Sequence, residues 1–404
     1  MASLGGMLPA DATTVMEEMK RAGYSTAVFS ANPLVSPQFG LGRGVDLFCE
    51  DAPSLLSGAL LNRISRTLSD RIEGMSWLHR FIVATGEILP SHHGDSRLLD
   101  RDAASMNESF FQWLDGRSGR FFAYLHYMEP HAPYDPPAPY DALFVDPGYD
   151  GPRMTDFPEG DSMMLPFVEG IAVSESRRAN MIAQYDGSIA YFDWSLGELL
   201  SGLRDRGLTD DTAIVLTSDH GEEFYDHSAW GHGQSLHQEL IRVPLLVWYP
   251  AGVPGGRMVE ERVRHVDLLP TLLGAAGLDE TADSPRFEGI NLWTILETGS
   301  APPPDLESYS EVNHGGHYAL SLISSRWKLI YTKFGSDEDV SLYDLSSDPG
   351  ETIDLSGHRP EVAESMLSRL MRLREGYASQ ALESTTRVMD AETEEKLRAL
   401  GYVE

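Results

Sequence analysis

The chain has 404 residues, of which 42% are apolar and 23% charged, as is ordinary for a folded globular protein. Its 62 acidic residues exceed its 31 Lys and Arg residues, so the formal net charge is −31. A surface this acidic repels polyphosphate backbones and anionic membrane surfaces, which argues against nucleic-acid binding and favours a solvated, salt-tolerant surface.

Cysteine usage and hydropathy exclude further classes of protein. Cys49 is the only cysteine, so an intramolecular disulfide framework and a cysteine-rich metal site are excluded. The most apolar run, at residues 243–249, is closed by Pro250 and is far shorter than the ~20 residues needed to cross a bilayer. The first residues carry no basic segment before an apolar one, so we expect neither a signal peptide nor a membrane-spanning segment. The sequence indicates no compartment and no oligomeric state.

The N-terminal part of the chain alternates between predicted helices and strands. Apolar positions at helical spacing predict a helix over residues 10–23, and residues 24–29 are β-like. Surface helices are predicted over residues 54–88 and 97–115. A second apolar strand is predicted over residues 120–127, followed by a proline-rich loop. A helix before the first strand is an odd start for an α/β domain, which indicates that the opening of the fold is incomplete.

The middle of the chain continues this alternation. A long helical pattern runs from about residue 175 to 206, with an interruption at residues 186–187. Apolar strands are predicted at residues 212–216 and 242–248, and a helix begins within residues 265–273. Because strands and helices alternate, we expect the α/β class, with a mostly parallel central sheet that is covered on both faces by helices.

The composition shifts at a run of prolines, residues 301–304, which marks a predicted boundary. We therefore expect an α/β domain at residues 1–300 and a smaller α+β subdomain at residues 305–404. The runs in the subdomain suit an antiparallel sheet and two amphipathic helices; they lie at residues 318–323, 327–334, 341–345, about 360–378 and about 391–400.

The most informative motif is TSDHGEE at residues 217–223, directly behind the apolar run 212–216. Such a run predicts a buried parallel strand that delivers Asp219 and His220 as metal ligands at its C-terminal edge. Neighbouring side chains on a strand point to opposite faces, so both reach one ion only where Gly221 lets the backbone turn. The two ligands suit Mg²⁺, Mn²⁺, Ca²⁺ or Zn²⁺. In the alternative interpretation, Asp219 caps a helix and His220 packs on it.

Two further histidines are candidates for catalysis. His232 lies between two glycines, which leaves its imidazole accessible for donating a hydrogen bond or a proton to an anionic leaving oxygen. His131 is flanked by prolines, which would hold its ring at low entropic cost, although an incidental histidine in a surface loop is the alternative. His227 and His237 lack such flanking signals, and we interpret them as surface or structural residues.

Additional polar residues could support the site. Glu222 and Glu223 are candidate acceptors that orient His220 or its neighbours, because metal-bound imidazoles usually donate their other nitrogen to an oxygen. A solvated pair at a helix start is the simpler alternative. His314 and His317 could line the site from the second domain.

Taken in order along the chain, these motifs resemble the sulfatase branch of the alkaline phosphatase superfamily. The matching blocks are LHYMEPHAPY at 125–134, YDGSIAY at 185–191, TSDHGEE at 217–223, GHG at 231–233, IRVPLL at 241–246, VDLLPTL at 266–272, LYDL at 342–345 and LRALGY at 397–402. The resemblance implies an alkaline-phosphatase-like fold with a smaller C-terminal subdomain. It implies that Asp219 and His220 bind the metal, that His131 contacts the sulfate or the leaving oxygen, and that His232 replaces a basic residue that neutralises the ester oxyanion.

By the same resemblance, the chain would be a metal-dependent hydrolase that acts on a sulfate ester of a small molecule or a glycan. Ca²⁺ is the first choice of metal, with Mn²⁺, Mg²⁺ and Zn²⁺ as alternatives. Sulfatases convert the Cys or Ser of a Cys- or Ser-x-Pro/Ala-x-Arg motif to formylglycine, and Cys49 has no such arginine after it. No aspartate pair precedes Ala10 either. We therefore expect the nucleophile segment to lie before Met1 and the chain as given to be inactive or impaired.

Other functions stay open. Asn32 lies where many sulfatases have a lysine and a histidine that bind the sulfate. One alternative is therefore a phosphodiester or phosphonate hydrolase, or a phosphoglycerol or phosphoethanolamine transferase, of the same superfamily. Another is a non-catalytic remnant or binding module.

Overall fold

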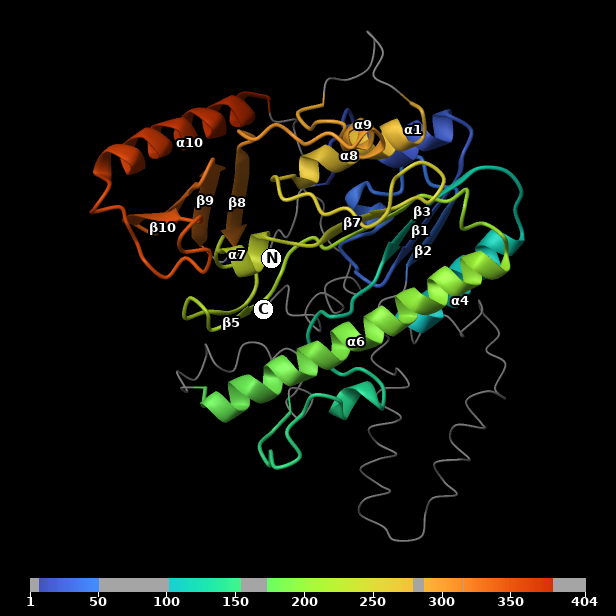
Figure 1. Ribbon diagram of the computed structural model, residues 1–404, viewed down its shortest axis with the longest axis horizontal. Helices are drawn as coiled ribbons and strands as arrows, with labels where there is room; N and C mark the ends of the chain where they lie inside the picture. The colour runs from blue at the N-terminus through green and yellow to red at the C-terminus, as the bar shows by residue number, and fades with distance from the viewer. Residues whose placement is uncertain (1–6, 51–101, 154–172, 279–286, 315, 381–404) are drawn as a thin grey trace. The chain divides into compact units, whose positions relative to one another are not determined.

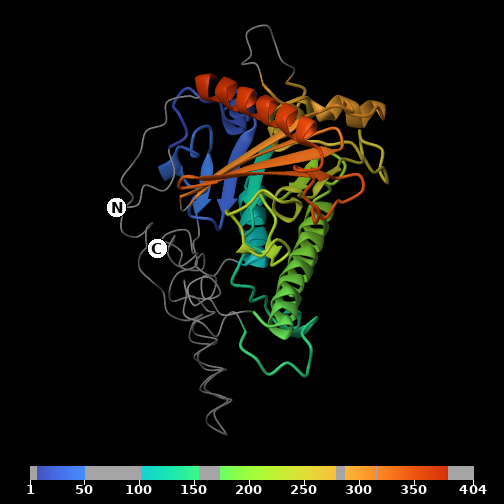
Figure 2. The same cartoon turned by 90° about the vertical axis from the view of Figure 1, so that its left-hand side faces the viewer.

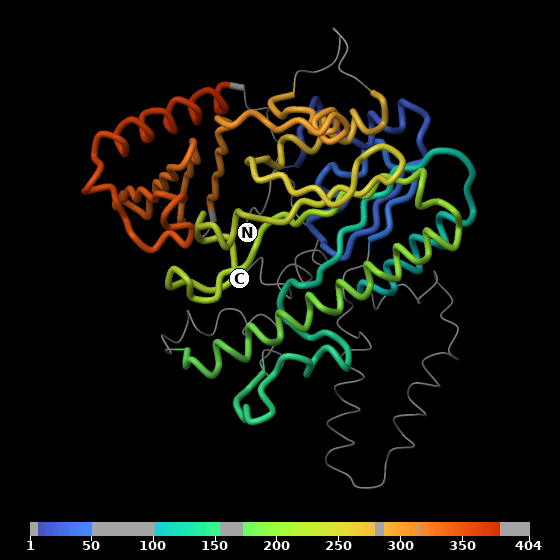
Figure 3. Tube along the Cα trace, viewed as in Figure 1, coloured from blue at the N-terminus to red at the C-terminus, as the bar shows by residue number. Residues whose placement is uncertain are grey.

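The structure is a computed structural model that describes residues 7–50, 102–153, 173–278, 287–314 and 316–380. Figure 3 traces these parts in colour. The predictions on residues 54–88, 97–101, 391–400 and 397–402 lie outside them. The chain divides into two compact units, Met1–Gly202 with Ser384–Glu404 and Leu203–Glu383. The domain boundary predicted at residues 301–304 stays a prediction.

The first unit is built around a parallel sheet of three strands. Its order is β2 (Leu47–Glu50), β1 (Ser25–Ser30) and β3 (Phe121–His126), with β1 paired on both sides (Figure 1). The β-branched and aromatic residues of β1 favour a strand buried on both faces, and Phe29 is almost inaccessible. The strands predicted near residues 24–29 and 120–127 are confirmed, whereas β2 was not predicted because only four residues form it.

Three α-helices of this unit lie within the described residues. Helix α1 (Val15–Arg21) begins with a capping box between Thr14 and Glu17. Helix α4 (Ala103–Asp115) is capped by Asp102, and the rings of its Phe110 and Trp113 lie edge-on to Phe29 at 6.0 and 6.1 Å. These aromatic contacts pack α4 against the sheet.

The third helix, α6 (Glu175–Asp205), is one uninterrupted helix of 31 residues, so the break predicted at residues 186–187 is wrong. At Gly187, an added Cβ would lie 2.4 Å from the carbonyl oxygen of Tyr140. The glycine therefore allows the turn η3 (Tyr140–Ala142) to approach the helix closely and does not end the helix.

The second unit begins with the strand that carries the central motif. β4 (Ile214–Thr217) pairs antiparallel with β7 (Leu245–Trp248). The expectation of a buried parallel strand is therefore wrong for this ladder: β4 is only half-buried, as an antiparallel pair can leave one face in water. Short elements follow each strand: β5 (Glu223–Phe224), β6 (Trp230–Gly231), α7 (Gln238–Ile241), η5 (His265–Asp267), α8 (Leu268–Ala275) and α9 (Leu292–Thr298).

An antiparallel sheet of four strands forms the C-terminal part of this unit. Its order is β11 (Asp337–Asp344), β10 (Trp327–Phe334), β9 (His317–Ser324) and β8 (Ser308–His314). Helix α10 (Pro360–Gln380) covers one face of it (Figure 2). The core between them consists mainly of Leu320, Leu322, Leu329, Leu342, Met366 and Leu370. Each such side chain contributes about 1.5–3 kcal/mol by leaving water.

The α/β class with a C-terminal antiparallel sheet is confirmed. The predicted strands at residues 318–323, 327–334 and 341–345 correspond to β9, β10 and β11, and the helix at 360–378 corresponds to α10. None of the helices within the described ranges is both long enough and apolar enough to cross a membrane.

Candidate active site

Asp219 and His220 lie directly after β4, where the chain turns away from the strand. We call residues 218–222 the metal turn. The Nδ1 of His220 donates to the carbonyl oxygen of Gly221 at 2.8 Å, which assigns the lone pair to Nε2. That Nε2 lies 3.9 Å from Oδ2 of Asp219. Two ligands that each lie about 2.0–2.6 Å from one ion are separated by a distance of this order. The pair therefore fits a shared cation.

Gly221 fixes the course of the metal turn by close packing. Its amide donates to the carbonyl oxygen of Leu240 in α7 at 2.8 Å. A Cβ on Gly221 would lie 2.0 Å from the carbonyl oxygen of Glu239. No other residue fits without moving α7, so glycine is required here for its small size.

His232 lies beside His220, in the loop that follows β6. The two imidazole rings stack with centroids 4.1 Å apart and an interplanar angle of 28°. The glycines on both sides of His232 have left-handed backbones, with φ of 80° and 88°. Nδ1 of His232 donates to Oε1 of the buried Glu222 at 2.8 Å. This bond fixes the orientation of the ring.

The two glutamates of the motif have different partners. Glu222 orients His232, a neighbour of His220, as one of the two interpretations suggested. Glu223 is buried and accepts the amides of His227 at 3.0 Å and Ala229 at 2.8 Å, so it holds the β5–β6 hairpin together. The alternative of a solvated pair is wrong, because both side chains are buried.

His265 is a neighbour of the metal turn that the sequence did not single out. Its Nε2 donates to the carbonyl oxygen of Ser218 at 2.9 Å, immediately before Asp219. The segment η5 that carries it is held by the buried Asp267, which pairs with Arg264 at 2.8 Å. The signal in the sequence was a histidine directly before the VDLLPTL block.

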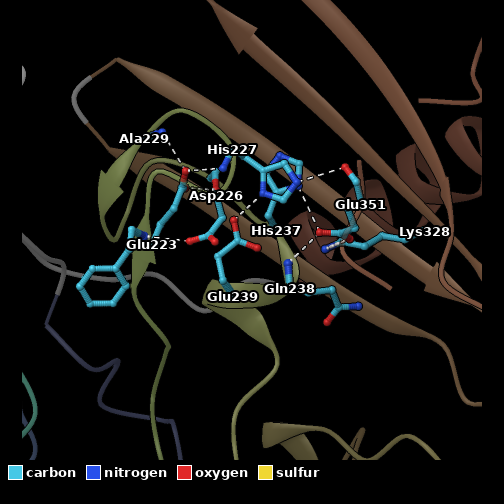
Figure 4. A network of polar contacts seen from close by, with 11 residues as sticks. Glu223, Asp226, His227, Ala229, His237, Gln238, Glu239, Lys328 and Glu351 are labelled. Carbon is cyan, nitrogen blue, oxygen red and sulfur yellow. Dashed lines mark hydrogen bonds and ion pairs between the residues drawn. The ribbon is translucent and has the colours of Figure 1, made fainter. Parts of the chain in front are cut away.

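A second group of possible metal ligands comprises His227, His237 and Glu351, whose ligand atoms lie within 4.8 Å of one another (Figure 4). The two imidazoles stack with centroids 3.6 Å apart and an interplanar angle of 3°. Lone pairs in two parallel planes do not converge on one ion. Nδ1 of His227 instead bonds Oε1 of Glu239 at 2.6 Å, and Nδ1 of His237 bonds Oε2 of Glu351 at 3.1 Å. This arrangement favours a hydrogen-bonded network, in line with the structural role expected for both histidines.

His131 belongs to the first unit, on the loop after β3. Its amide donates to the carbonyl oxygen of Met128 at 2.5 Å, and its Nδ1 donates to that of Ala132 at 2.6 Å. Asn32 is buried, and its Oδ1 accepts the amide of Leu34 at 2.9 Å, so it caps a local turn. The structure thus brings Asp219, His220 and His232 together within the second unit, and the role of His131 stays a prediction.

Glu129, two residues before His131, was missed by the sequence analysis. Its Oε1 accepts the amide of Ala103 at the start of α4 at 3.1 Å. Burial raises the pKa of this carboxyl to about 7, with a smaller contribution from the charge of Asp102. Its position beside a proline in a loop gave no sign that the carboxyl would be buried.

The last two candidates lie in the C-terminal sheet. His314 and His317 are paired across β8 and β9, at the end where the two strands connect. Their predicted place at the edge of the site stays a prediction.

Comparisons with known proteins agree with this architecture. The family model for sulfatases matches residues 5–278, and the model "N-sulphoglucosamine sulphohydrolase, C-terminal" matches residues 226–376. Arylsulfatase K of Mus musculus is 26% identical over 387 residues, which are 89% of this chain and 64% of that protein. Choline-sulfatase of Rhizobium meliloti is 24% identical over 355 residues, 85% of this chain and 67% of that protein. The chain therefore spans less than two thirds of arylsulfatase K.

Solved structures share the fold. A protein in complex with its substrate D-glucosamine-2-N,6-O-disulfate has a TM-score of 0.66 at 17% identity, over 93% of this chain and 84% of that one. Phosphonate monoester hydrolase from Silicibacter pomeroyi has a TM-score of 0.65 at 21% identity, over 94% of this chain and 85% of that one. The family model covers well over half of the sequence, and the fold is alkaline-phosphatase-like α/β: the chain belongs to the sulfatase family.

Proposed function

We propose that this protein hydrolyses the sulfate ester of a small molecule or a glycan and depends on a divalent metal. One observation carries the proposal: His220 Nε2 lies 3.9 Å from Asp219 Oδ2, and the ring of His232 stacks on His220 at 4.1 Å. A pair of cation ligands on the metal turn and an imidazole from the loop after β6 thus lie side by side. Membership of the sulfatase family supports the choice of sulfate as the esterified acid.

Asp219 and His220 would hold the metal ion. Bound there, the ion would act as a Lewis acid that polarises the sulfate oxygens. A carboxylate oxygen suits the hard cations, so Ca²⁺ is the proposed metal. Mn²⁺, Mg²⁺ and Zn²⁺ are the alternatives, because imidazole also binds softer ions.

His232 is the proposed acid for the leaving group. Cleavage of the ester builds negative charge on the departing oxygen, and a donor aimed at that oxygen lowers the barrier. Glu222 holds the ring by its Nδ1 at 2.8 Å. In the protonated imidazolium form, Nε2 would carry the proton that passes to the leaving oxygen. His131 is proposed, on the family resemblance, as a further contact to the sulfate.

The missing nucleophile motif limits the hydrolytic activity that we expect of these 404 residues. They contain no Cys- or Ser-x-Pro/Ala-x-Arg motif. We therefore propose that these residues bind metal and sulfate ester but hydrolyse the ester slowly or not at all.

Calorimetric titration with Ca²⁺ tests the ligand assignment without requiring turnover. Asp219→Asn and His220→Asn are each expected to weaken Ca²⁺ binding by about tenfold or more, because each removes one of few ligands. Asp210→Asn, which removes an exposed carboxylate on the loop before β4, is the matched control and should bind like wild type. Unchanged affinity in both site variants would refute the assignment.

A substrate panel tests the reaction. We would compare the rates at which 4-nitrophenyl sulfate, a 4-nitrophenyl phosphodiester and a phenyl phosphonate monoester are hydrolysed. The enzyme is the 404-residue chain or the chain read from any upstream start codon. The sulfate ester is expected to be hydrolysed fastest, and His232→Asn should lower kcat by about 10²–10⁴-fold. Faster hydrolysis of the diester or phosphonate would favour the related hydrolases. Binding without turnover in every form would favour the binding module.

A further inference from the structure

We propose that Glu351, with its partner Lys328, is a positioning residue for the metal turn and acts through helix α7. The observation is a chain of direct contacts within one compact unit, from Lys328 and Glu351 to Gln238 of α7 (Figure 4) and from Leu240 of α7 to Gly221. The inference rests on the proposed metal ligands Asp219 and His220 and adds the residues that hold them in place.

Glu351 is at the centre of a buried network. Its Oε2 accepts the amide of Gln238 at 2.8 Å and bonds Nδ1 of His237 at 3.1 Å. Its Oε1 lies 2.5 Å from Nζ of Lys328 in β10, at angles outside those of a directed hydrogen bond, and both side chains are fully buried. The carboxylate therefore links the C-terminal sheet to the first residue of α7.

The backbone of Glu351 supports a specific role. Its φ is 54°, in the left-handed region. Residues other than glycine, asparagine and aspartate adopt this backbone conformation at a cost in free energy. Such conformations persist only where the surroundings fix them, and they gather at functional sites. The strained position follows Pro349 and Gly350. Glycine would adopt this φ without strain, so the glutamate side chain is present at an energetic cost.

His227 connects the same network to the side chain of Glu239 in α7. Its Nδ1 bonds Oε1 of Glu239 at 2.6 Å, and its Nε2 bonds the backbone carbonyl of Glu351 at 3.1 Å. Both partners are acceptors, so both ring nitrogens donate only when the imidazole is protonated. The positive charges of His227 and Lys328 therefore compensate the carboxylates of Glu239 and Glu351.

Helix α7, held in place by Glu351, directly contacts the metal turn. The carbonyl oxygen of Leu240 accepts the amide of Gly221 at 2.8 Å, and that of Glu239 lies within 2.0 Å of where a Cβ of Gly221 would be. With contact this close, a shift of α7 displaces Gly221 and, with it, the neighbouring His220. An apolar pair of the same size would fill the space without fixing the direction of Gln238.

Two variants test the proposal. Glu351→Gln removes the charge that holds Lys328 and His237. Gln238→Pro removes the N–H that Glu351 accepts, together with the glutamine side chain. Proline is well tolerated at the first position of a helix, and the preceding His237 already has an extended backbone, with φ −71° and ψ 165°. Asp344→Asn is the control: this buried carboxylate of β11 pairs with Arg326 and accepts the amide of Ser346.

Mn²⁺ affinity by electron paramagnetic resonance and hydrogen exchange of the Gly221 amide are measured, with the melting temperature. Glu351→Gln and Gln238→Pro are expected to weaken Mn²⁺ binding by about tenfold, as loss of an outer contact to a metal ligand typically does. Both should speed exchange at Gly221, whereas Asp344→Asn should lower only the melting temperature. If Glu351→Gln fails to fold, Gln238→Pro decides alone.

Two outcomes would contradict these expectations. Lower melting temperatures with unchanged Mn²⁺ affinity and unchanged exchange at Gly221 would overturn the proposal and leave Glu351 a stabilising residue. Wild-type protein that binds no Mn²⁺ would instead refute the metal assignment under the proposed function. In that case the exchange of the Gly221 amide still decides whether α7 positions the turn.

Discussion

Gly221 is the residue on which the geometry of the metal turn depends most directly. Its neighbour His220 presents Nε2 beside Asp219 only because the chain turns tightly against α7. The contact is between backbones, so neither side can relieve a clash by changing a rotamer. Adding one methyl group at Gly221 therefore displaces the neighbouring metal ligands.

Gly221→Ala is expected to destabilise the protein by about 1–3 kcal/mol through overpacking and to weaken Ca²⁺ binding at the same time. The added Cβ would lie 2.0 Å from the carbonyl oxygen of Glu239. Urea unfolding and calorimetric Ca²⁺ titration measure the two effects. Gly255→Ala is the control, since nothing lies within 4 Å of its Cβ, and it should stay within about 0.5 kcal/mol of wild type. Wild-type stability in Gly221→Ala would contradict the packing argument.

Some local expectations about individual residues agree with the structure. Asp219 and His220 lie where the chain turns after β4, and His232 lies between two glycines with left-handed backbones. The roles of these residues in metal binding and catalysis stay predictions. The partner of His232 could not be assigned, because either Glu222 or Glu223 could have faced it. His265 was missed because its contact with Ser218 joins residues 47 positions apart, and no local pattern marks such a contact.

At the scale of elements, the start of α4 combines two carboxyl groups. Asp102 caps the helix through the amide of Ser105, and Glu129 accepts the amide of Ala103 from the loop after β3. The hydroxyl of Tyr191 in α6 donates to Asp102 at 2.5 Å. The helix dipole favours these carboxylates, but burial of Glu129 opposes its ionisation and raises its pKa to about 7.

The raised pKa of Glu129 makes stability depend on pH. The folded protein keeps a proton that the unfolded chain releases near its usual pKa of 4.5. This contribution is therefore fully present below pH 4.5 and is lost as the pH rises through about 7. The contribution of this carboxyl to stability is about 1–3 kcal/mol.

Glu129→Gln should remove this pH dependence, because the amide cannot ionise and its oxygen can still accept the amide of Ala103. Urea midpoints from pH 4.5 to 8 are expected to fall less steeply in the variant, and to exceed the wild-type values above pH 7. Glu108→Gln, on the exposed side of α4, should leave the wild-type slope unchanged. Parallel slopes for wild type and Glu129→Gln would contradict the prediction.

Local patterns predicted most elements but misjudged those that depend on partners. The apolar runs located β1, β3, β9, β10 and β11. The strand β8 was missed because its residues, SYSEVNH, are polar, and its pairing with β9 supplies the stability that its composition lacks. The pairing of β4 with β7 was misjudged because a short apolar run does not reveal the direction of its neighbour.

At the scale of the whole molecule, the network of Glu351 joins segments that are more than 100 residues apart in the chain. His227 and Glu351 are 124 residues apart in sequence, and their contact could not be predicted from either neighbourhood. The sequence analysis interpreted His227 and His237 as surface or structural residues because they lack flanking signals, and it could not identify these partners. It predicted the family and the α/β class from ordered motifs, since those depend on local spacing.

The charge of His227 links this network to the pH of the solution. Burial lowers the pKa of His227, but the hydrogen bonds to Glu239 and to the carbonyl of Glu351 raise it more, so the net pKa lies above the usual 6.5. Glu223 bonds its amide, Lys328 and Glu351 form the buried pair beside it, and His237 stacks on its ring. Since the folded protein holds the proton more tightly, this stabilisation is complete below pH 6.5 and is lost as the pH rises through the folded pKa.

Replacing His227 with Gln should therefore flatten the fall in stability above pH 6.5, while lowering stability below that pH, where the imidazolium bridges Glu239 and Glu351. Thermal melts between pH 5.5 and 8.5 measure both effects. His358→Asn, an exposed histidine before α10, is the matched control and should follow the wild-type curve. A variant whose melting temperature declines as steeply as that of wild type would show that another group titrates, because Gln can donate to Glu239 but cannot lose a proton in this range.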